Sequence, residues 1–590
     1  MSLVARVKEA AAKAIEALYQ ISFSADAVLV NQTKPEFEGD YTIVLFALIK
    51  QLKKSPEVLG KELGDYLMQQ HHDLFTSYNI IKGFLNLTVK DEYLVQFLSE
   101  NSTTVPLINP DTTKKIIIEY SSPNTNKPLH LGHLRNIFYG WSVAQILKAA
   151  GQDVMKTCVV NDRGVHICKS MIAWEQFSNG ATPESTATKG DHFVGDYYVK
   201  FSNEHKRQIE ELIATGISKE EAEKRAPIMQ QTQQMLVDWE KGKPEVIDLW
   251  KRMNSWVYKG FDQTYQRIGA DFDKIYYESE TYLLGKRFVE EGLAQGVLFK
   301  KEDGSVWIDL TAEGLDEKLV LRKDGTSVYI TQDLGLAEEK YQDFHYDQSF
   351  YVIADEQNYH MKVLKLILQK LGKPYADGIQ HLSYGMVELP SGRMKSREGT
   401  VVDADDLIDE MVKEAAAKTK EKSKVEEFSN EELNQLYETI ALGALKFFLI
   451  KVDPKKRMVF NPEESIDFHG FTGPFIQYTH ARIKSILRKE TPSGSLRTDG
   501  TLEKLEKELL LLLEQYPQIV KDAATEHNPA AVANYVYSVA QTYNTFYTAH
   551  SVLKAEDEEK KQLRLHLCQL TANVLKEGMY LLGINVPERM

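Results

Sequence analysis

The sequence is poor in cysteine and has no long apolar run. Its three cysteines, Cys158, Cys168 and Cys568, form no CxxC pair, which argues against a disulfide framework and against structural zinc. The sequence contains no run of 18 or more apolar residues, which is the length needed to span a bilayer. The start, MSLVARVKEAAAKAIEALYQ, contains acidic residues where a signal peptide would be apolar. We therefore expect a soluble, cytoplasmic protein that does not bind a membrane.

Positive charge is also scarce. The chain has 71 Lys and Arg residues against 85 Asp and Glu residues, which gives a net charge of −14. This balance argues against a sequence-independent nucleic-acid binder with a long basic groove. It does not exclude a folded RNA held by a few local basic surfaces. At 590 residues the chain is too long for one hydrophobic core, and we expect three or four domains.

The first 105 residues have the pattern of a small α+β domain. One helical stripe is predicted at the start of the chain, and a second apolar stripe follows in YTIVLFALIKQLKK. The segment GFLNLTV alternates as a strand does. The first stripe consists of Val4, Val7, Ala11, Ile15 and Leu18. A turn-rich linker, NSTTVPLINPDTTKK, follows this domain.

Residues 110–400 have the pattern of a Rossmann-like α/β domain. Three strand candidates, IIIEY, DVMKTCVVND and SFYVIAD, are separated by helical segments. This alternation indicates a doubly wound parallel sheet, and such sheets bind ligands at the carboxyl ends of their strands. A charged stretch at about 178–290 without strand signals predicts a helical insertion.

The remainder of the chain is predicted to be helical. Residues 401–460 are expected to form a connecting stem, and residues 461–590 an all-α bundle. Within the bundle, Asn528 and Pro529 form a good N-cap and first turn for a helix.

The stretch NTNKPLHLGHLRN contains two histidines, His130 and His133, three residues apart around a glycine. A metal site would need further ligands in frame, and the stretch offers none. Packing in a core would leave Pro128 and Gly132 unexplained. A phosphate site accounts for all four residues: a strand, a turn and a helix start present backbone N–H groups. The glycine leaves room for a flat base, and both imidazoles can donate hydrogen bonds to phosphate.

A second candidate lies far downstream in SGRMKSREGTVVDADDL. Its basic residues Arg393, Lys395 and Arg397 can close over the same phosphates. A solvated surface loop is the alternative. The order of the two motifs, with a parallel-sheet pattern between them, favours the phosphate site.

These two motifs resemble a known pair of signatures. HLGH and RMKSR are similar to the HIGH and KMSKS motifs of class I aminoacyl-tRNA synthetases. The segments EYSSPNTNKPLHLGHLRN, DGTSVYITQDL, ADEQNYH, GPFIQYTHARIKSILRK and LGINVPERM resemble arginyl-tRNA synthetases, and the resemblance covers nearly the whole chain. It implies a class I synthetase fold in which the N-terminal domain contacts the tRNA elbow and the final bundle reads the anticodon.

The resemblance also implies binding sites. The guanidinium of arginine is a rigid fork of donors that needs planar acceptors and carboxylates around it. The implied arginine-binding residues are Glu119, Asn124, Tyr329, Asp333 and Gln357. The implied ATP-binding residues are His130, Leu131, Gly132, His133, His360, Met394 and Ser396. The implied tRNA-binding residues are Tyr478, Arg482, Lys484 and Arg488. Tyr535 and Tyr547 can stack on anticodon bases, but we favour packing within the bundle.

One departure concerns the lysines of KMSKS. The first is Arg393 here and the second is Arg397. In arginyl enzymes a lysine ahead of the HIGH motif takes over the phosphate contact, and Lys127 occupies that place. The catalytic set implied by the resemblance is Lys127, His130, His133, Arg393, Lys395 and Arg397.

The resemblance implies a ligase that joins L-arginine to tRNA(Arg) with ATP, and with Mg²⁺ bound to the nucleotide. We expect a monomer with no metal site of its own, and adenylate formation that requires tRNA, as is usual in the family. No segment has the size of an editing domain, which fits a substrate recognised by polar contacts. Two alternatives remain: another HxGH nucleotidyltransferase or synthetase, and a non-catalytic RNA-binding relative.

Overall fold

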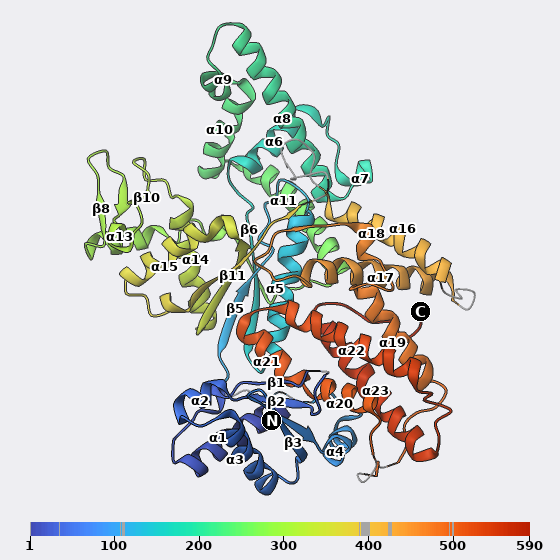
Figure 1. The fold of residues 1–590 in the computed structure, drawn as a ribbon. Coiled ribbons are helices and arrows are strands. Elements are labelled where there is room, and N and C mark those ends of the chain that lie inside the picture. The colour runs from blue at the N-terminus through green and yellow to red at the C-terminus, as the bar shows by residue number, and fades with distance from the viewer. Residues whose placement is uncertain are drawn as a thin grey trace.

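The computed structural model describes residues 2–34, 36–106, 108, 112–388, 390, 402–422, 428–494, 496–497 and 501–590. A parallel sheet lies at the centre of the molecule, and a helical insertion projects from one end (Figure 1). The N-terminal domain and the C-terminal bundle lie together at the opposite end (Figure 1). Among the described residues, no helix is long and apolar enough to cross a membrane.

The N-terminal domain packs helices on a four-stranded antiparallel sheet with strand order β1-β2-β4-β3. The expected stripe YTIVLFALIKQLKK is divided between a strand and a helix. Its β-branched residues favour the strand, and the helix begins two residues after that strand ends. The elements are α1 (Leu3–Tyr19), β1 (Val30–Gln32), β2 (Tyr41–Val44), α2 (Phe46–Leu52), α3 (Pro56–Gln70), β3 (Phe75–Ile81), β4 (Phe84–Val89) and α4 (Asp91–Asn101).

The central sheet has five parallel strands in the order β12-β11-β5-β6-β7. Its strands are β5 (Lys115–Glu119), β6 (Asp153–Val160), β7 (Lys274–Tyr277), β11 (Gln348–Ala354) and β12 (Ile379–Tyr384). β5 is the middle strand, paired on both edges, and residues 116–118 are buried, as in parallel sheets that are covered on both faces. The chain order reverses beside β5, so its carboxyl end is the expected ligand position in this fold. From there the chain turns into helix α5 (Leu131–Ala149).

The insertion is helical up to Ile268 and then returns to the sheet. The helical insertion is predicted at about 178–290, but strand β7 lies within that range. The predicted insertion therefore extends too far toward the C-terminus. β7 gave no clear signal because it is a four-residue edge strand with only Tyr276 buried. The helices are α6 (Val165–Phe177), α7 (Pro183–Thr186), α8 (Gly190–Ala214), α9 (Lys219–Arg225), α10 (Pro227–Glu240) and α11 (Pro244–Ile268).

A second lobe follows β7. It contains a small antiparallel sheet of order β10-β9-β8 together with helices that lie beside the main sheet (Figure 1). Its elements are α12 (Glu278–Thr281), α13 (Lys286–Ala294), β8 (Leu298–Lys300), β9 (Val306–Ile308), β10 (Lys318–Leu321), α14 (Tyr329–Phe344) and α15 (Asn358–Lys370).

In the described residues of the last part of the chain, the elements are helices and a two-residue pairing of β13 (Val387–Glu388) with β14 (Met458–Val459). The helices are α16 (Ala404–Lys422), α17 (Asn430–Ile450), α18 (Pro462–Ser465), α19 (Gly473–Leu487), α20 (Lys504–Glu514), α21 (Tyr516–Glu526), α22 (Pro529–Ala549) and α23 (Glu558–Leu581). The predicted cap of α22 is confirmed, since Asn528 Oδ1 accepts the Ala530 N–H at 3.1 Å.

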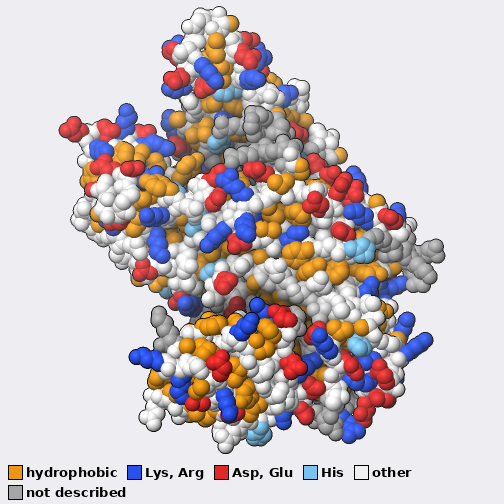
Figure 2. Space-filling view, in the orientation of Figure 1, with side chains coloured by type: hydrophobic (Ala, Val, Ile, Leu, Met, Phe, Trp, Pro, Cys, Tyr) orange, Lys and Arg blue, Asp and Glu red, His pale blue; other side chains and the backbone are white. Residues whose placement is uncertain are grey.

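Helix α5 connects this bundle to the sheet. Tyr139 Oη donates to the His527 carbonyl at 3.2 Å, and Ser142 Oγ donates to the Leu581 carbonyl at 2.8 Å. The N-terminal domain meets the bundle separately, where Lys507 Nζ lies 3.1 Å from both Asp40 Oδ2 and Asp91 Oδ1. Acidic and basic side chains are mixed over the visible surface (Figure 2).

Candidate ATP and arginine site

The two histidines of HLGH cap helix α5 with their ring nitrogens. His130 is the N-cap residue, and its Nδ1 accepts the Gly132 N–H at 3.1 Å. His133 Nδ1 accepts the His130 N–H, also at 3.1 Å, and the ring centroids are 3.9 Å apart. Because each Nδ1 is an acceptor, a neutral ring must carry its proton on Nε2. Both rings therefore have one Nε2–H donor that these caps do not use.

Burial keeps both rings neutral. Burial, and to a smaller extent the nearby charge of Lys127, lowers the pKa of His130 to about 3. The pKa of His133 is lowered well below its usual value by burial, then by His130 and Lys127. Burial also lowers the pKa of Lys127. The start of α5 thus combines uncharged N–H donors with an amine and with the positive end of a helix, which suits an anion.

Gly132 lies close to the His130 ring of this cap. A Cβ atom built on Gly132 would lie 3.0 Å from His130 Cε1 and 3.1 Å from His130 Nδ1. Both contacts are tighter than normal, so a side chain here would require the His130 ring to shift by a few tenths of an ångström. From the sequence, Gly132 is explained by the space that it leaves for a flat base. The contact with His130 is a second, steric reason for a glycine at this position.

The segment that follows the downstream basic motif lies against the histidines. The Leu131 N–H donates to the Val402 carbonyl at 3.2 Å, and the Ala404 N–H donates to the Leu129 carbonyl at 3.0 Å. His130 and Asp403 form an antiparallel bridge between these bonds. The predicted residues Arg393, Met394, Lys395, Ser396 and Arg397 lie outside the described residues, and their roles stay predictions.

Glu119 ends β5 beside this turn and is buried. It forms an ion pair with the fully buried Lys340 and accepts a hydrogen bond from Ser122 Oγ at 2.9 Å. Its charge is therefore already compensated within the protein. Asn124 is exposed in the same turn and bridges to Asn161, which follows β6.

The other predicted arginine-binding residues come from the second lobe. Asp333 lies on α14, and its Oδ2 accepts from His360 Nε2 of α15 at 2.5 Å. Tyr329, the first residue of α14, is 75% exposed. Gln357 is exposed immediately before α15. The structure thus brings His360, which was predicted to bind ATP, to a carboxylate predicted to bind arginine.

Sequence reasoning missed Glu278, the acid that directly follows β7. Burial, together with the negative charges of Asp162 and Asp333, raises its pKa to about 7 against the opposing effect of Arg163. The negative charge of Asp333 therefore acts on Glu278. An acid at the carboxyl end of a strand would have been the signal, but β7 itself was not recognised.

The four predicted tRNA-binding residues lie along α19 and its end, and all four contact other parts of the bundle, Tyr478 through the Phe468 ring. The Arg482 guanidinium lies over the rings of Tyr478 and Tyr547, and its Nη1 donates to Asn544 Oδ1 at 2.5 Å. Lys484 Nζ is 3.1 Å from Glu588 Oε2, and Arg488 Nη1 donates to the Glu588 carbonyl at 2.7 Å. Tyr535 is buried, which agrees with a packing role.

Comparisons with known proteins agree along the whole chain. Three family models match: "Arginyl tRNA synthetase N terminal domain" at residues 5–89, "tRNA synthetases class I (R), catalytic domain" at 94–461, and "DALR anticodon binding domain" at 476–590. An arginine–tRNA ligase of Amoebophilus asiaticus is 51% identical over 591 residues, covering 99% of each chain. One from Bacteroides thetaiotaomicron is 51% identical over 584 residues, covering 98% of each.

Solved structures give the same result. The Thermus thermophilus arginyl-tRNA synthetase has a TM-score of 0.80 at 25% identity and covers 100% of both chains. The fold is also that of the Plasmodium falciparum enzyme, with a TM-score of 0.78 at 18% identity and coverage of 100% of this chain and 99% of that one. The predicted fold, a class I parallel-sheet domain with an N-terminal α+β domain and a helical C-terminal bundle, is confirmed. The chain belongs to the arginyl-tRNA synthetase family.

Proposed function

We propose that this chain is an arginine–tRNA ligase that activates L-arginine with ATP and transfers it to the 3′-terminal adenosine of tRNA(Arg). The observation that carries the site assignment is the pair of neutral histidines at the start of α5, each with an Nε2–H donor and with Lys127 beside them. This anion-binding turn lies at the carboxyl end of the middle strand of the sheet.

The ATP phosphates would bind at this turn. The arginine carboxylate attacks the α-phosphorus, the bond from that phosphorus to the bridging oxygen breaks, and pyrophosphate leaves with its electrons. Lys127 and the Nε2–H groups of His130 and His133 stabilise the charge that grows on the phosphate oxygens. Holding carboxylate and phosphorus in line provides most of the remaining rate enhancement. Arg393, Lys395 and Arg397 are proposed to contact the same phosphates.

Mg²⁺ would accompany the nucleotide and neutralise phosphate charge. Two carboxylates in the segment bonded to the histidine turn, Asp403 and Asp405, are already engaged by side chains of the insertion. The phosphate oxygens themselves are therefore the better ligands for magnesium. We propose no zinc site.

The arginine side chain would extend toward the second lobe. Its guanidinium is always charged, and Asp333 and Glu278 provide two carboxylates that already repel each other. A cation between the two carboxylates removes that repulsion. The planar guanidinium can donate to both carboxylates, whereas the compact ammonium of lysine could not reach both. Asn124, Glu119 and Gln357 are proposed to hold the α-amino end, with Tyr329 beside the guanidinium.

In the second step the 2′-hydroxyl of the terminal adenosine attacks the carbonyl carbon of arginyl-adenylate, and AMP leaves. We propose that residues 1–105 contact the tRNA elbow and that residues 461–590 read the anticodon. Lys484 and Arg488, already at the edge of the bundle, are proposed to meet the tRNA backbone, with Tyr478 and Arg482 behind them. We further propose a cytoplasmic monomer.

The test is ATP–pyrophosphate exchange and tRNA charging with each amino acid, with and without tRNA. We expect that arginine is the only amino acid charged to tRNA. We also expect that ATP–pyrophosphate exchange depends on added tRNA. Charging with lysine or glutamine but not arginine would refute the assigned specificity.

A further inference from the structure

Helix α8 of the insertion contacts both segments that form the proposed phosphate site. Its Gly195 lies against the turn before HLGH: a Cβ atom there would be 2.7 Å from Pro128 Cδ and 3.6 Å from the Cα atom of Lys127. Only a glycine allows this approach without moving the turn. The turn carries Lys127, so the position of that amine depends on the surface of α8.

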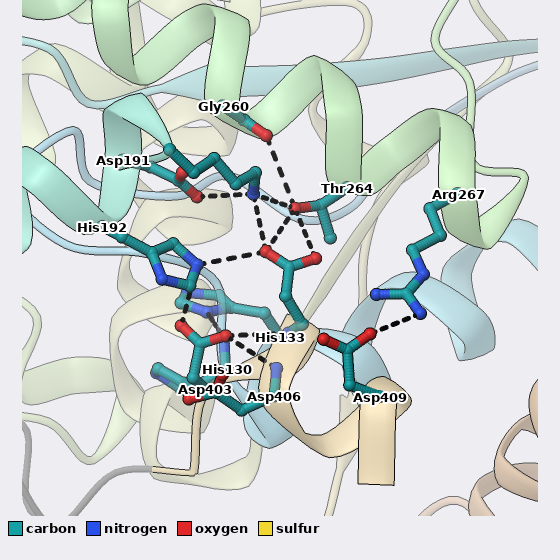
Figure 3. Close-up of polar contacts among 12 residues, drawn as sticks. His130, His133, Asp191, His192, Gly260, Thr264, Arg267, Asp403, Asp406 and Asp409 are labelled. Atoms are coloured by element: carbon teal, nitrogen blue, oxygen red, sulfur yellow. Dashed lines mark hydrogen bonds and ion pairs between the residues drawn. The ribbon is translucent and has the colours of Figure 1, made fainter. Parts of the chain in front are cut away.

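The same face of α8 holds the segment on the other side of the histidines. Lys189 is the N-cap residue of α8, and His192 and Gly195 follow at successive intervals of three residues, which places the three at neighbouring positions on the helix surface. Lys189 Nζ is 2.6 Å from Asp405 Oδ2. His192 Nε2 is 3.1 Å from the same oxygen and 3.4 Å from Asp403 Oδ2 (Figure 3).

Helix α8 packs closely against α11, with glycines at the points of closest approach. A Cβ atom on Gly190 would lie 2.0 Å from the Trp256 carbonyl oxygen, and one on Gly260 would lie 2.2 Å from Asp191 Oδ1. Thr264 of α11 joins the polar contacts, at 2.5 Å from Lys189 Nζ (Figure 3). Because α11 leads into β7 of the central sheet, α8 is rigidly placed relative to the sheet.

Asp191, His192 and Asp405 lie close enough together to hold a metal ion. However, the Lys189 ammonium already bridges the two carboxylates, at 3.0 Å from Asp191 Oδ2 and 2.6 Å from Asp405 Oδ2. A divalent ion at this place would meet that ammonium. The cluster is therefore an internal ion-pair network, and Asp191 is fully buried within it.

We propose that α8 is a positioning element for adenylate formation, in which Lys189, His192 and Gly195 hold residues 402–405 and the Lys127–His130 turn in a fixed relation. The inference rests on the proposed binding of ATP phosphates at that turn. None of the three residues touches the reacting atoms. Removal of Lys189 leaves Asp405 without its closest cationic partner, and residues 402–405 are then expected to lose their alignment with Leu129 and Leu131.

The experiment compares Lys189→Met, His192→Asn and Gly195→Ala with the conservative variant Lys189→Arg. The matched control is His205→Asn, since His205 lies on α8 but contacts the Glu223 carbonyl of α9 and the Phe201 ring, neither of which belongs to the two segments of the proposed phosphate site. For each full-length protein, kcat and KM for ATP and for arginine are measured by ATP–pyrophosphate exchange with tRNA present. Transfer from added arginyl-adenylate to tRNA is measured separately, and thermal melting monitors folding.

The three disrupting variants are expected to lower kcat/KM for ATP roughly 10- to 100-fold, because a misplacement of about 1 Å can cost that much. The KM for arginine and the transfer rate should stay within about twofold of wild type. A general loss of structure would instead lower kcat/KM for ATP, arginine binding and transfer together. Lys189→Arg should restore most of the rate, and His205→Asn should behave as wild type.

Two results would overturn the inference: wild-type exchange kinetics in Lys189→Met and Gly195→Ala, or an equal loss in both substrates and in transfer. Lys127→Ala in the same series separates the two proposals. If Lys127→Ala is slow and the α8 variants are normal, only the role of α8 is wrong. If Lys127→Ala exchanges at the wild-type rate, the proposed phosphate site is wrong, and this inference is wrong with it.

Discussion

Arginine binding should release a proton from Glu278 near neutral pH. In the free protein, burial and the charges of Asp162 and Asp333 hold the pKa of Glu278 at about 7 against the opposing effect of Arg163. A guanidinium placed between Glu278 and Asp333 favours the ionised carboxylate, because it replaces lost solvation with an opposite charge. The protonated form binds arginine poorly, so affinity should rise with pH and level off above the pKa.

The magnitude follows from the pKa. At pH 6 about one Glu278 in ten is ionised, and at pH 8 nearly all are, so the Kd for arginine should be about tenfold weaker at pH 6. This corresponds to about 1.4 kcal/mol. Glu278→Gln should remove the pH dependence. At pH 8 it should also weaken binding by about 30-fold or more, since it truncates a desolvated charge pair.

The assay is titration calorimetry with arginine at pH 6, 7 and 8, in buffers of different ionisation enthalpy so that the proton release is counted. Glu280→Gln is the matched control, because Glu280 lies on the same short helix and is exposed. A wild-type Kd that is constant from pH 6 to 8, or a Glu278→Gln variant that binds as wild type, would refute the reasoning.

Three further predictions concern stability and the histidine cap. Burial raises the pKa of Glu514 to about 7, so the free energy of unfolding should fall as pH rises from about 4.5 to 7, and urea titrations of Glu514→Gln should lack that fall. Lys340→Met leaves the buried Glu119 without its cation and should cost about 3–5 kcal/mol in the same urea titrations; an unchanged midpoint would contradict the ion pair. Gly132→Ala displaces His130 and should slow pyrophosphate exchange roughly 10- to 100-fold, whereas a normal rate would show that the cap is dispensable.

The sequence predicted the centre of the fold because β5, β6 and β11 are apolar runs of the kind that parallel sheets bury on both faces. It did not predict β7, because an edge strand of four partly exposed residues has no such run. It also merged β2 with α2, because a strand and a helix in direct succession give one continuous apolar stretch. When an apolar stretch continues from a strand into a helix, the boundary between the two elements is set by strand pairing in the folded protein and cannot be located from the sequence pattern.

The site was predictable to the extent that it is local in sequence. HLGH and the lysine before it lie within seven residues, and a strand–turn–helix pattern is enough to suggest phosphate binding. The protonation of His130 and His133 was not predictable, because it depends on which backbone N–H group each ring accepts. Lys189 and Asp405 are 216 residues apart in the chain, and nothing in their local sequence indicates the contact.

The central claim is that Lys127 and the two histidines hold the ATP phosphates during adenylate formation. The most direct measurement is the rate of ATP–pyrophosphate exchange by Lys127→Ala with tRNA present. The control is Lys148→Ala, which removes an exposed lysine near the other end of α5. The account predicts a loss of about 100-fold in Lys127→Ala with tRNA binding intact. An exchange rate equal to that of wild type would contradict it.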